Sequence, residues 1–171
     1  AGNEEVFTFL QTVLAEVLEI FPSRHVHVGG DEAPHDRWQA CPRCRERIAA
    51  EGLAGTDHLQ SWFLGRIGRW LADRGRQLIG WDEILQGGLN PGATVQSWQG
   101  FAGAVAAARQ GHDTIVSPTS HAYLDYDVGV TDLATCYAFE PVPPELELDP
   151  DAAARVLGAE DARIKREQEL F

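Results

Sequence analysis

Apolar and polar positions follow two different patterns along the chain. From residue 3 to 20, and again from 58 to 74, apolar residues recur every three or four positions, which predicts two amphipathic helices. Residues 25–28, 77–81 and 94–98 instead form short runs of β-branched and other apolar side chains, which predict buried strands. The first half of the chain is therefore expected to alternate helices with strands.

The same alternation continues in the second half. An alanine-rich helix is predicted at 101–110, a strand at 113–117 and a last strand from Val156. Asp149-Pro150 has the form of an N-cap followed by proline at the first helical position, so a short helix should precede that strand. Residues 126–150 carry four prolines and are predicted as a loop.

Polar residues predict where the two helices of the first half begin. Asn3 is placed to cap the first helix. Asp57 is the expected cap of the second, and Gln60 three residues later completes a capping-box pattern. Between these helices, residues 35–56 are predicted as a loop with one short helix near 43–50.

Alternation of helices and strands also predicts the fold class. It implies parallel strands joined by crossover helices, and therefore an α/β fold. Each predicted strand ends in acidic or aromatic residues, and in a barrel the carboxyl ends of all strands share one mouth. A (β/α)₈ barrel is therefore favoured. A Rossmann-like sheet is the competing architecture, but no GxGxxG follows a strand.

Length and charge narrow the classes of function. The 171 residues, 44% of them hydrophobic, suffice for one globular domain, expected to span 1–171. Acidic residues outnumber basic ones 26 to 14, and the net charge of −12 argues against nucleic acid or an anionic membrane as partner. No apolar run is long enough to cross a bilayer, and no signal peptide is visible. The compartment stays open, secreted or cytoplasmic.

Three cysteines raise the question of a metal or redox site. Cys41-Pro-Arg-Cys44 is a CxxC, and Cys136 is the third. A structural zinc needs about four ligands, and only His35 lies near in the sequence. We therefore expect no metal, and interpret the motif as a surface turn that is able to form a disulfide.

Aromatic residues stand at the ends of successive strands. Trp81 is followed by Asp82, Trp98 ends the next strand, and Tyr123 precedes Asp125. A tryptophan alone is more often part of a core, but several at strand ends favour binding. Aromatic faces cover the C–H faces of a pyranose and carboxylates bind its hydroxyls, so a sugar is the expected ligand.

Asp31 and Glu32 are the candidate catalytic pair. They follow a strand and two glycines, which let the backbone bend and approach a ligand. A bare acidic pair is ordinarily a solvated loop, and the strand-end position is what favours chemistry. Adjacent side chains diverge, which suits poorly a glycosidase with two carboxylates on opposite sides of the anomeric carbon. The pair fits better if one acid protonates the leaving oxygen and the other steadies a substrate group that acts as nucleophile.

The stretch HVGGDEAP, residues 27–34, resembles the H-x-G-G-D-E signature of the family 20 glycoside hydrolases, the β-N-acetylhexosaminidases. The resemblance continues in the family's order through LQSWF, GRQLIGWDEIL, TVQSWQG, SPTSHAYLDYD, YAFEPVP and VLGAE. It implies a (β/α)₈ barrel that hydrolyses terminal non-reducing N-acetyl-D-hexosamine residues from β-N-acetylhexosaminides with retention. It also implies no metal or organic cofactor, and an oligosaccharide or glycoconjugate partner containing N-acetylglucosamine or N-acetylgalactosamine.

The resemblance assigns roles to individual residues. Glu32 resembles the general acid that protonates the glycosidic oxygen and then acts as base for water. Asp31 resembles the residue that orients the 2-acetamido group as its oxygen attacks C1 to give an oxazolinium-type intermediate. Tyr123 resembles the hydroxyl donor to the acetamido carbonyl, with Asp125 as its neighbour. Trp81 and Trp98 resemble the aromatic residues that line the sugar site. Asp82 matches the acid after the strand-end tryptophan, without an assigned role. His27 matches the motif's histidine, which is either buried and satisfied or a proton relay.

The resemblance starts at the family's fourth strand. The first three strands, with the family's sugar-gripping arginine, have no counterpart, so we expect a partial barrel of about strands 4 to 8 that needs the missing N-terminal half. After VLGAE the family continues with a tryptophan and a glutamate, whereas residues 161–171 match nothing in that motif. We therefore expect the isolated chain to be inactive or nearly so.

Two other functions stay open at this point. A non-catalytic or degenerate sugar-binding barrel fragment would bind through its aromatic residues without turnover, and an assay on an aryl N-acetylglucosaminide separates it from an enzyme. A hydrolase that uses Asp31 and Glu32 as metal ligands is the third, and insensitivity to chelators would remove it. The motifs do not distinguish gluco from galacto substrates, and they leave the natural substrate and the oligomeric state open.

Overall fold

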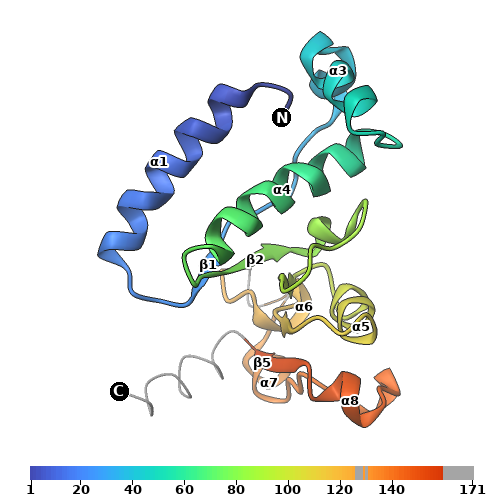
Figure 1. Ribbon diagram of the computed structural model, residues 1–171. Coiled ribbons are helices and arrows are strands. Elements are labelled where there is room, and N and C mark those ends of the chain that lie inside the picture. Colours follow the sequence, from blue (N-terminus) through green and yellow to red (C-terminus); the bar gives the residue numbers. More distant parts are fainter. Residues whose placement is uncertain (126–128, 130, 160–171) are drawn as a thin grey trace. The chain divides into compact units, whose positions relative to one another are not determined.

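The computed structural model describes residues 1–125, 129 and 131–159, and the expected atypical tail at 161–171 lies outside them. The chain divides into two compact units, Ala1–Ala93 and Thr94–Phe171, and each is taken by itself below. Figure 1 labels most of the helices and several of the strands. Within the described ranges, no helix is long and apolar enough to cross a membrane.

The first unit, every residue of which is described, alternates helices with two parallel strands. β1 and β2 pair with His25 opposite Gln77 and His27 opposite Ile79. The parallel pairing predicted from the alternation is thereby confirmed in this unit. The elements are α1 (Glu4–Ile20), β1 (His25–His27), α2 (Asp36–Ala40), α3 (Pro42–Ala50), α4 (Thr56–Ala72), β2 (Gln77–Trp81) and the 3₁₀ helix η1 (Asp82–Leu85).

The core of the first unit lies where α4 packs on β2 (Figure 1). α4 buries Leu59, Ile67 and Leu71, each at most 3% exposed, and β2 buries Leu78. Burial of one such side chain stabilises a fold by roughly 1.5–3 kcal/mol. The same helix also buries Gln60, a polar residue whose burial apolar periodicity does not explain.

α1 is tied to α4 through its first two turns. It begins as predicted after Asn3, whose side chain accepts a hydrogen bond from the second backbone N–H of the helix. Phe7 is the buried residue of α1, with its ring centroid 5.6 Å from that of Trp62 and 4.9 Å from that of Phe63. Farther along α1, Phe9 and other apolar side chains stay exposed.

For residues 35–60, one expectation is confirmed in part and one is wrong. The short helix predicted near 43–50 is confirmed as α3, but a second helix, α2, was not predicted and is separated from α3 by Cys41 alone. α4 has Gly55 as its N-cap and no side-chain cap, so Asp57 and Gln60 form no capping box. Their polar atoms instead bind the segment that follows β1, and those contacts override the local capping signal.

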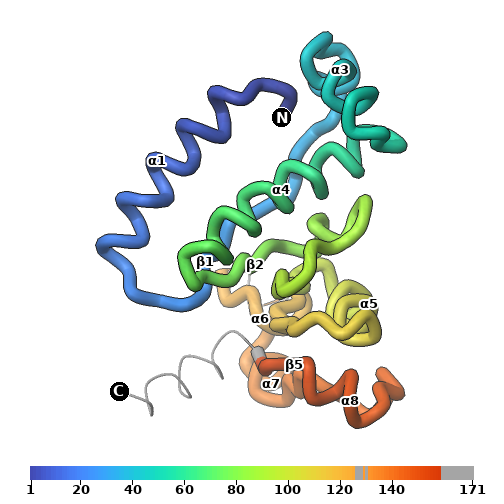
Figure 2. The backbone as a smooth tube through the Cα atoms, viewed as in Figure 1, coloured from blue at the N-terminus to red at the C-terminus, as the bar shows by residue number. Residues whose placement is uncertain are grey.

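The second unit contains three parallel strands among its described residues. β3 pairs with β4, Gln96 opposite Ile115, and β4 pairs with β5, Thr114 opposite Val156. α5 packs on β3 and β4 and contacts α8, and the path of the chain through them can be followed in Figure 2. The elements are β3 (Thr94–Ser97), α5 (Ala102–Arg109), β4 (Thr114–Val116), α6 (Thr119–Ala122), α7 (Leu133–Tyr137), η2 (Pro144–Leu146), α8 (Pro150–Ala153) and β5 (Val156–Ala159).

The cap predicted for the last helix is confirmed, and the loop predicted before it is wrong in part. Asp149 accepts a hydrogen bond from the N–H of Ala152 at 2.8 Å, with proline at the first helical position. The described part of 126–150 contains α7 and η2. Its prolines all follow residue 140, which leaves 133–137 free to be helical. Asp132 caps α7, and the hydrogen bond from the backbone N–H of Thr135 lowers the pKa of the Asp132 carboxyl.

Candidate active site

The turn that follows β1 stays bonded to β2 beyond the end of the strand. The N–H of Val28 donates to the carbonyl of Ile79, and the N–H of Trp81 donates to the carbonyl of Gly29, both at 2.9 Å. The backbone pairing therefore runs on to Gly29. Asp31 and Glu32 come directly after it, at the carboxyl end of β1, which is where parallel α/β folds place their ligands.

The backbone of this turn adopts left-handed conformations. Gly29 and Gly30 have φ angles of 74° and 99°, which glycine adopts readily. Glu32 has a φ of 46°, a conformation that costs a non-glycine residue about 1–3 kcal/mol and that clusters at functional sites. Asp31 and Glu32 are both exposed. The turn thus presents two carboxylates to solvent from a strained backbone.

The ring of His27 contacts both the turn and Trp81. Its Nδ1 accepts a hydrogen bond from the N–H of Gly29 at 3.1 Å, and its centroid lies 4.7 Å from that of Trp81. Desolvation of the ring lowers the pKa of His27, and the Asp31 carboxylate acts in the opposite direction. The neutral ring with its proton on Nε2 satisfies this geometry. Three of the residues predicted for the site, His27, Asp31 and Trp81, are therefore brought together.

A chain of hydrogen bonds joins the turn to α4. Gln60 donates from Nε2 to the carbonyl of Gly30 at 2.7 Å, and its Oε1 lies 2.6 Å from Nε2 of His35. Nδ1 of His35 lies 2.9 Å from Oδ1 of Asp57. None of these side chains was predicted for the site from the sequence. A glutamine within the apolar stripe of a helix was the available signal.

The residues after β2 support the turn from another side. Trp81 ends the strand half-buried, and Asp82 opens η1 at 9% exposure, unlike the exposed acids after β1. Ile84 in η1 packs against two glycines. A methyl group at Gly30 would lie 2.8 Å from Cγ2 of Ile84, and one at Gly80 would lie 2.6 Å from the same atom. Glycine at both positions is what lets the acidic turn lie close to η1.

The second unit carries the remaining predicted residues, Trp98, Tyr123 and Asp125. Trp98 follows β3, is half-buried, and accepts a hydrogen bond on its carbonyl from the N–H of Thr119 at 2.9 Å. Tyr123 follows α6 directly and is half-buried, whereas Asp125 is exposed. These three residues form a set of their own, located after β3 and β4 of their unit.

An aromatic cluster next to Tyr123 was not predicted. The ring centroid of His121 lies 6.0 Å from that of Phe101 and 5.3 Å from that of Phe139. Nδ1 of His121 is also 2.8 Å from the hydroxyl of Ser120. Because His121 precedes Tyr123 by two residues, these contacts hold the segment that presents the tyrosine. A histidine inside the SPTSHAYLDYD stretch was the signal for it.

The CxxC opens a helix and is not the surface turn that we expected. Cys41 is the N-cap of α3, and Cys44 is 3% exposed within that helix. Hydrogen bonds from the backbone and side chain of Cys44 lower the pKa of the Cys41 thiol, and both cysteines are free. Among the described residues, no three His, Cys, Asp or Glu side chains gather as a metal ion would require.

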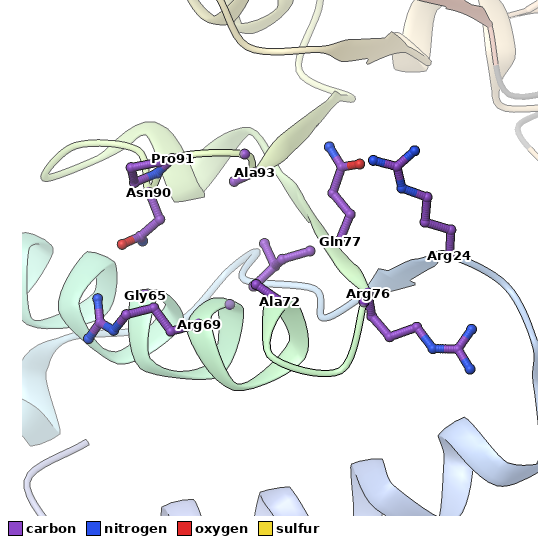
Figure 3. Close-up of a pocket in the computed structure, with 13 residues that line it drawn as sticks. Arg24, Gly65, Arg69, Ala72, Arg76, Gln77, Asn90, Pro91 and Ala93 are labelled. Atoms are coloured by element: carbon purple, nitrogen blue, oxygen red, sulfur yellow. The ribbon is translucent and has the colours of Figure 1, made fainter.

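A cavity of about 550 Å³ opens at the opposite ends of the same two strands (Figure 3). Arg24, which precedes β1, and Gln77, the first residue of β2, line one side of it, and Asn90 and Pro91 line another. None of the residues predicted for the site lines this cavity. They follow the carboxyl ends of the strands, whereas the cavity lies at the amino ends.

Comparison with known proteins shows which family the chain resembles. The chain matches the model of glycosyl hydrolase family 20, catalytic domain, over residues 1–164. It is 44% identical over 161 residues to a β-hexosaminidase of Porphyromonas gingivalis, covering 87% of this chain and 21% of that protein. It resembles a solved chitobiase of Flavobacterium johnsoniae, with a TM-score of 0.81 and 31% identity over 92% of this chain and 25% of the other. A family 20 exo-β-N-acetylglucosaminidase of Vibrio harveyi, solved in complex with N-acetylglucosamine, gives a TM-score of 0.80 and 28% identity over 92% of this chain and 27% of that one.

These matches extend over nearly the whole chain, although the chain spans only about a fifth of the Porphyromonas protein and about a quarter of the two solved chains. They confirm the predicted fold class, an α/β chain of the (β/α)₈ barrel type, and the parallel strands of each unit agree with it. Since the family model matches residues 1–164, the chain belongs to the catalytic domain of glycosyl hydrolase family 20.

Proposed function

We propose that the protein hydrolyses terminal non-reducing N-acetyl-D-hexosamine residues from β-N-acetylhexosaminides and retains the anomeric configuration. One observation carries the proposal: a chain of family 20 presents Asp31 and Glu32 side by side and exposed, with Glu32 in a left-handed backbone conformation. Neighbouring side chains at a strand end diverge, so the two carboxylates serve different atoms of one substrate.

Glu32 acts as the general acid and base. Its carboxyl group protonates the glycosidic oxygen as the bond to C1 breaks, and then takes a proton from the water that attacks C1. General acid catalysis of this kind contributes typically about 10²–10⁴-fold to the rate. The exposure of Glu32 supports this role, because the group must exchange protons with both a leaving alcohol and water.

Asp31 acts on the 2-acetamido group. The acetamido oxygen attacks C1 to form an oxazolinium-type intermediate, and the Asp31 carboxylate orients the group and stabilises the positive charge that develops on it. Charge that exists only near the transition state is where a fixed anion accelerates a reaction most. The hydrogen bond from the N–H of Gly29 to Nδ1 of His27 supports this role, because it holds the ring against the turn that carries Asp31.

The remaining predicted residues bind the sugar in this proposal. Trp81 and Trp98 cover apolar faces of the ring and the acetamido methyl group. Tyr123 donates its hydroxyl to the acetamido carbonyl, and Asp125 and Asp82 bind polar groups of the substrate. Both tryptophans are half-buried, which supports this role because part of each residue stays accessible to a ligand.

The substrate class follows from the same family membership. The curated relatives are named β-hexosaminidases, and a solved relative holds N-acetylglucosamine. We therefore propose an oligosaccharide or glycoconjugate that ends in β-linked N-acetylglucosamine or N-acetylgalactosamine as the substrate of this protein.

The test is an assay of the full-length protein, as its gene encodes it, on an aryl N-acetyl-β-D-glucosaminide and its galacto isomer. Release of the aryl alcohol, with the β-anomer of the free sugar formed first in the NMR spectrum, is the expected result. A protein that binds the sugar without releasing the alcohol would be a binding module, and first formation of the α-anomer would refute the retaining mechanism.

A further inference from the structure

Gln60 occupies a position where an apolar residue would be expected. It lies on the buried side of α4 beside Leu59 and is 4% exposed. Its side-chain Nε2 donates to the carbonyl of Gly30 at 2.7 Å. A buried polar side chain destabilises the fold unless it is hydrogen-bonded. The hydrogen bonds of Gln60 therefore offset the cost of its burial.

The orientation of the Gln60 amide is fixed from both ends. The carbonyl of Gly30 accepts only, so the amide must present its NH₂ group there and its Oε1 toward His35, 2.6 Å from Nε2. The other ring nitrogen of His35 faces the Asp57 carboxylate at 2.9 Å. The His35 ring also stacks on Trp38, with centroids 4.8 Å apart and planes 17° from parallel. The glutamine is therefore held by a ring that has little freedom of its own.

The hydrogen bond to Gly30 holds the peptide group directly before Asp31. The carbonyl of Gly29 is held by the N–H of Trp81, and the next carbonyl, that of Gly30, is held by Gln60. Asp31 follows at once. Two consecutive peptide carbonyls fixed by different elements, β2 and α4, determine the direction in which the chain enters the acidic pair.

We propose that Gln60, held by His35 and Asp57, is a positioning residue for the acidic pair. It touches no substrate. It fixes the peptide before Asp31, and through it the directions of the Asp31 and Glu32 carboxylates. The proposal rests on the proposed function for its kinetic consequence, whereas the bracing of the turn itself is measurable without turnover.

The sharpest test is Gln60→Glu in the full-length protein. The side chain keeps its shape and Oε1, but the donor to Gly30 is replaced by a second acceptor. The matched control is Gln110→Glu, because Gln110 also donates from Nε2 to a backbone carbonyl, that of Ala106 at 3.0 Å, on the exposed end of α5. Misplacement of catalytic groups costs up to about 100-fold, so we expect kcat to fall about 10- to 100-fold in Gln60→Glu with little change in KM. The control should retain wild-type kcat.

A combination with Glu32→Gln separates positioning from general damage. Residues that act as one unit have non-additive effects, so the loss in the double variant should be smaller than the product of the two single losses. Losses that multiply would overturn the proposal. The variants Gln60→Asn and Gln60→His each keep a side-chain N–H donor at this position. A kcat higher than that of Gln60→Glu in either variant would identify the donor itself as what matters.

Hydrogen exchange of the backbone amides at residues 29–33 and 35 tests the bracing without any assay of turnover. Faster exchange in Gln60→Glu but not in Gln110→Glu is the expected result, and it would stand even if the wild-type protein proved inactive on every aryl glycoside. Unchanged exchange in that segment, with unchanged kcat where turnover exists, would overturn the proposal.

Discussion

Nδ1 of His27 accepts a hydrogen bond from the backbone N–H of Gly29 at 3.1 Å, which links the last residue of β1 to the first glycine of the acidic turn. The bond requires an unprotonated Nδ1, and desolvation of the ring lowers the pKa of His27 in agreement with that. The geometry of the turn is therefore coupled to the neutral state of this histidine.

Stability should fall on acidification because of this residue. The pKa of His27 in the folded chain lies below its ordinary value of 6.5, so the unfolded chain binds the proton more readily. The contribution of His27 to the free energy of unfolding is complete above pH 6.5. It is lost as the pH falls from 6.5 through the pKa of His27 in the folded chain. Denaturant unfolding between about pH 7.5 and 5 should show this component, and His27→Asn, which keeps an acceptor for Gly29, should remove it. An identical pH profile in the variant would contradict the assignment.

Glu32→Gln should remove most turnover and leave sugar binding nearly intact. We expect kcat to fall by about 10²–10⁴-fold on substrates with poor leaving groups, and by less on those with good ones, which need little protonation. Kinetics on a series of aryl glycosides measures the difference. Equal losses along the series would speak against the general acid role.

Asp31→Asn should act on the acetamido chemistry. Its anion stabilises charge that develops only in the transition state, so kcat should fall more than affinity. A thiazoline analogue of the cyclised intermediate should inhibit the wild-type protein and bind the variant less tightly. Equal cleavage of a substrate that lacks the 2-acetamido group would rule out substrate assistance.

Gly30→Ala should destabilise the fold more than a matched change at Gly88. The two glycines have matched φ angles of 99° and 101°, in a region that alanine rarely adopts. A methyl group at Gly30 meets Ile84 at 2.8 Å, whereas one at Gly88 meets nothing within 4 Å. Overpacking of this kind costs about 1–3 kcal/mol, which is the expected difference in the free energy of unfolding between the two variants. Equal values would mean that Ile84 moves aside freely.

The 171-residue chain purified by itself should self-associate. α1 exposes the large apolar side chains of Phe9, at 64%, and Ile20, at 71%, and exposed apolar surface promotes association. Sedimentation velocity over a range of concentrations measures the effect, and Phe9→Gln with Ile20→Gln should reduce it. A wild-type chain that stays monomeric at every concentration would contradict the expectation.

The sequence by itself predicted most of the longer helices and strands, and it placed Asp31 and Glu32 directly after a strand. The strands predicted at 77–81 and 94–98 correspond to β2 and β3, and the caps predicted at Asn3 and Asp149 are present, because apolar periodicity and capping act within a few residues of one another. The position of Asp31 and Glu32 after a strand was predictable for the same reason, since it is a property of one short stretch.

Only the tertiary structure decided how that pair is held. The local signal assigned Asp57 and Gln60 to a capping box, whereas they bind His35 and Gly30 across separations of 22 and 30 residues. Short-range patterns do not specify partners that far apart, because packing of α4 on β2 is what brings them within reach. The left-handed backbone of Glu32 is likewise a property of the folded turn, since its residue type predicts the opposite.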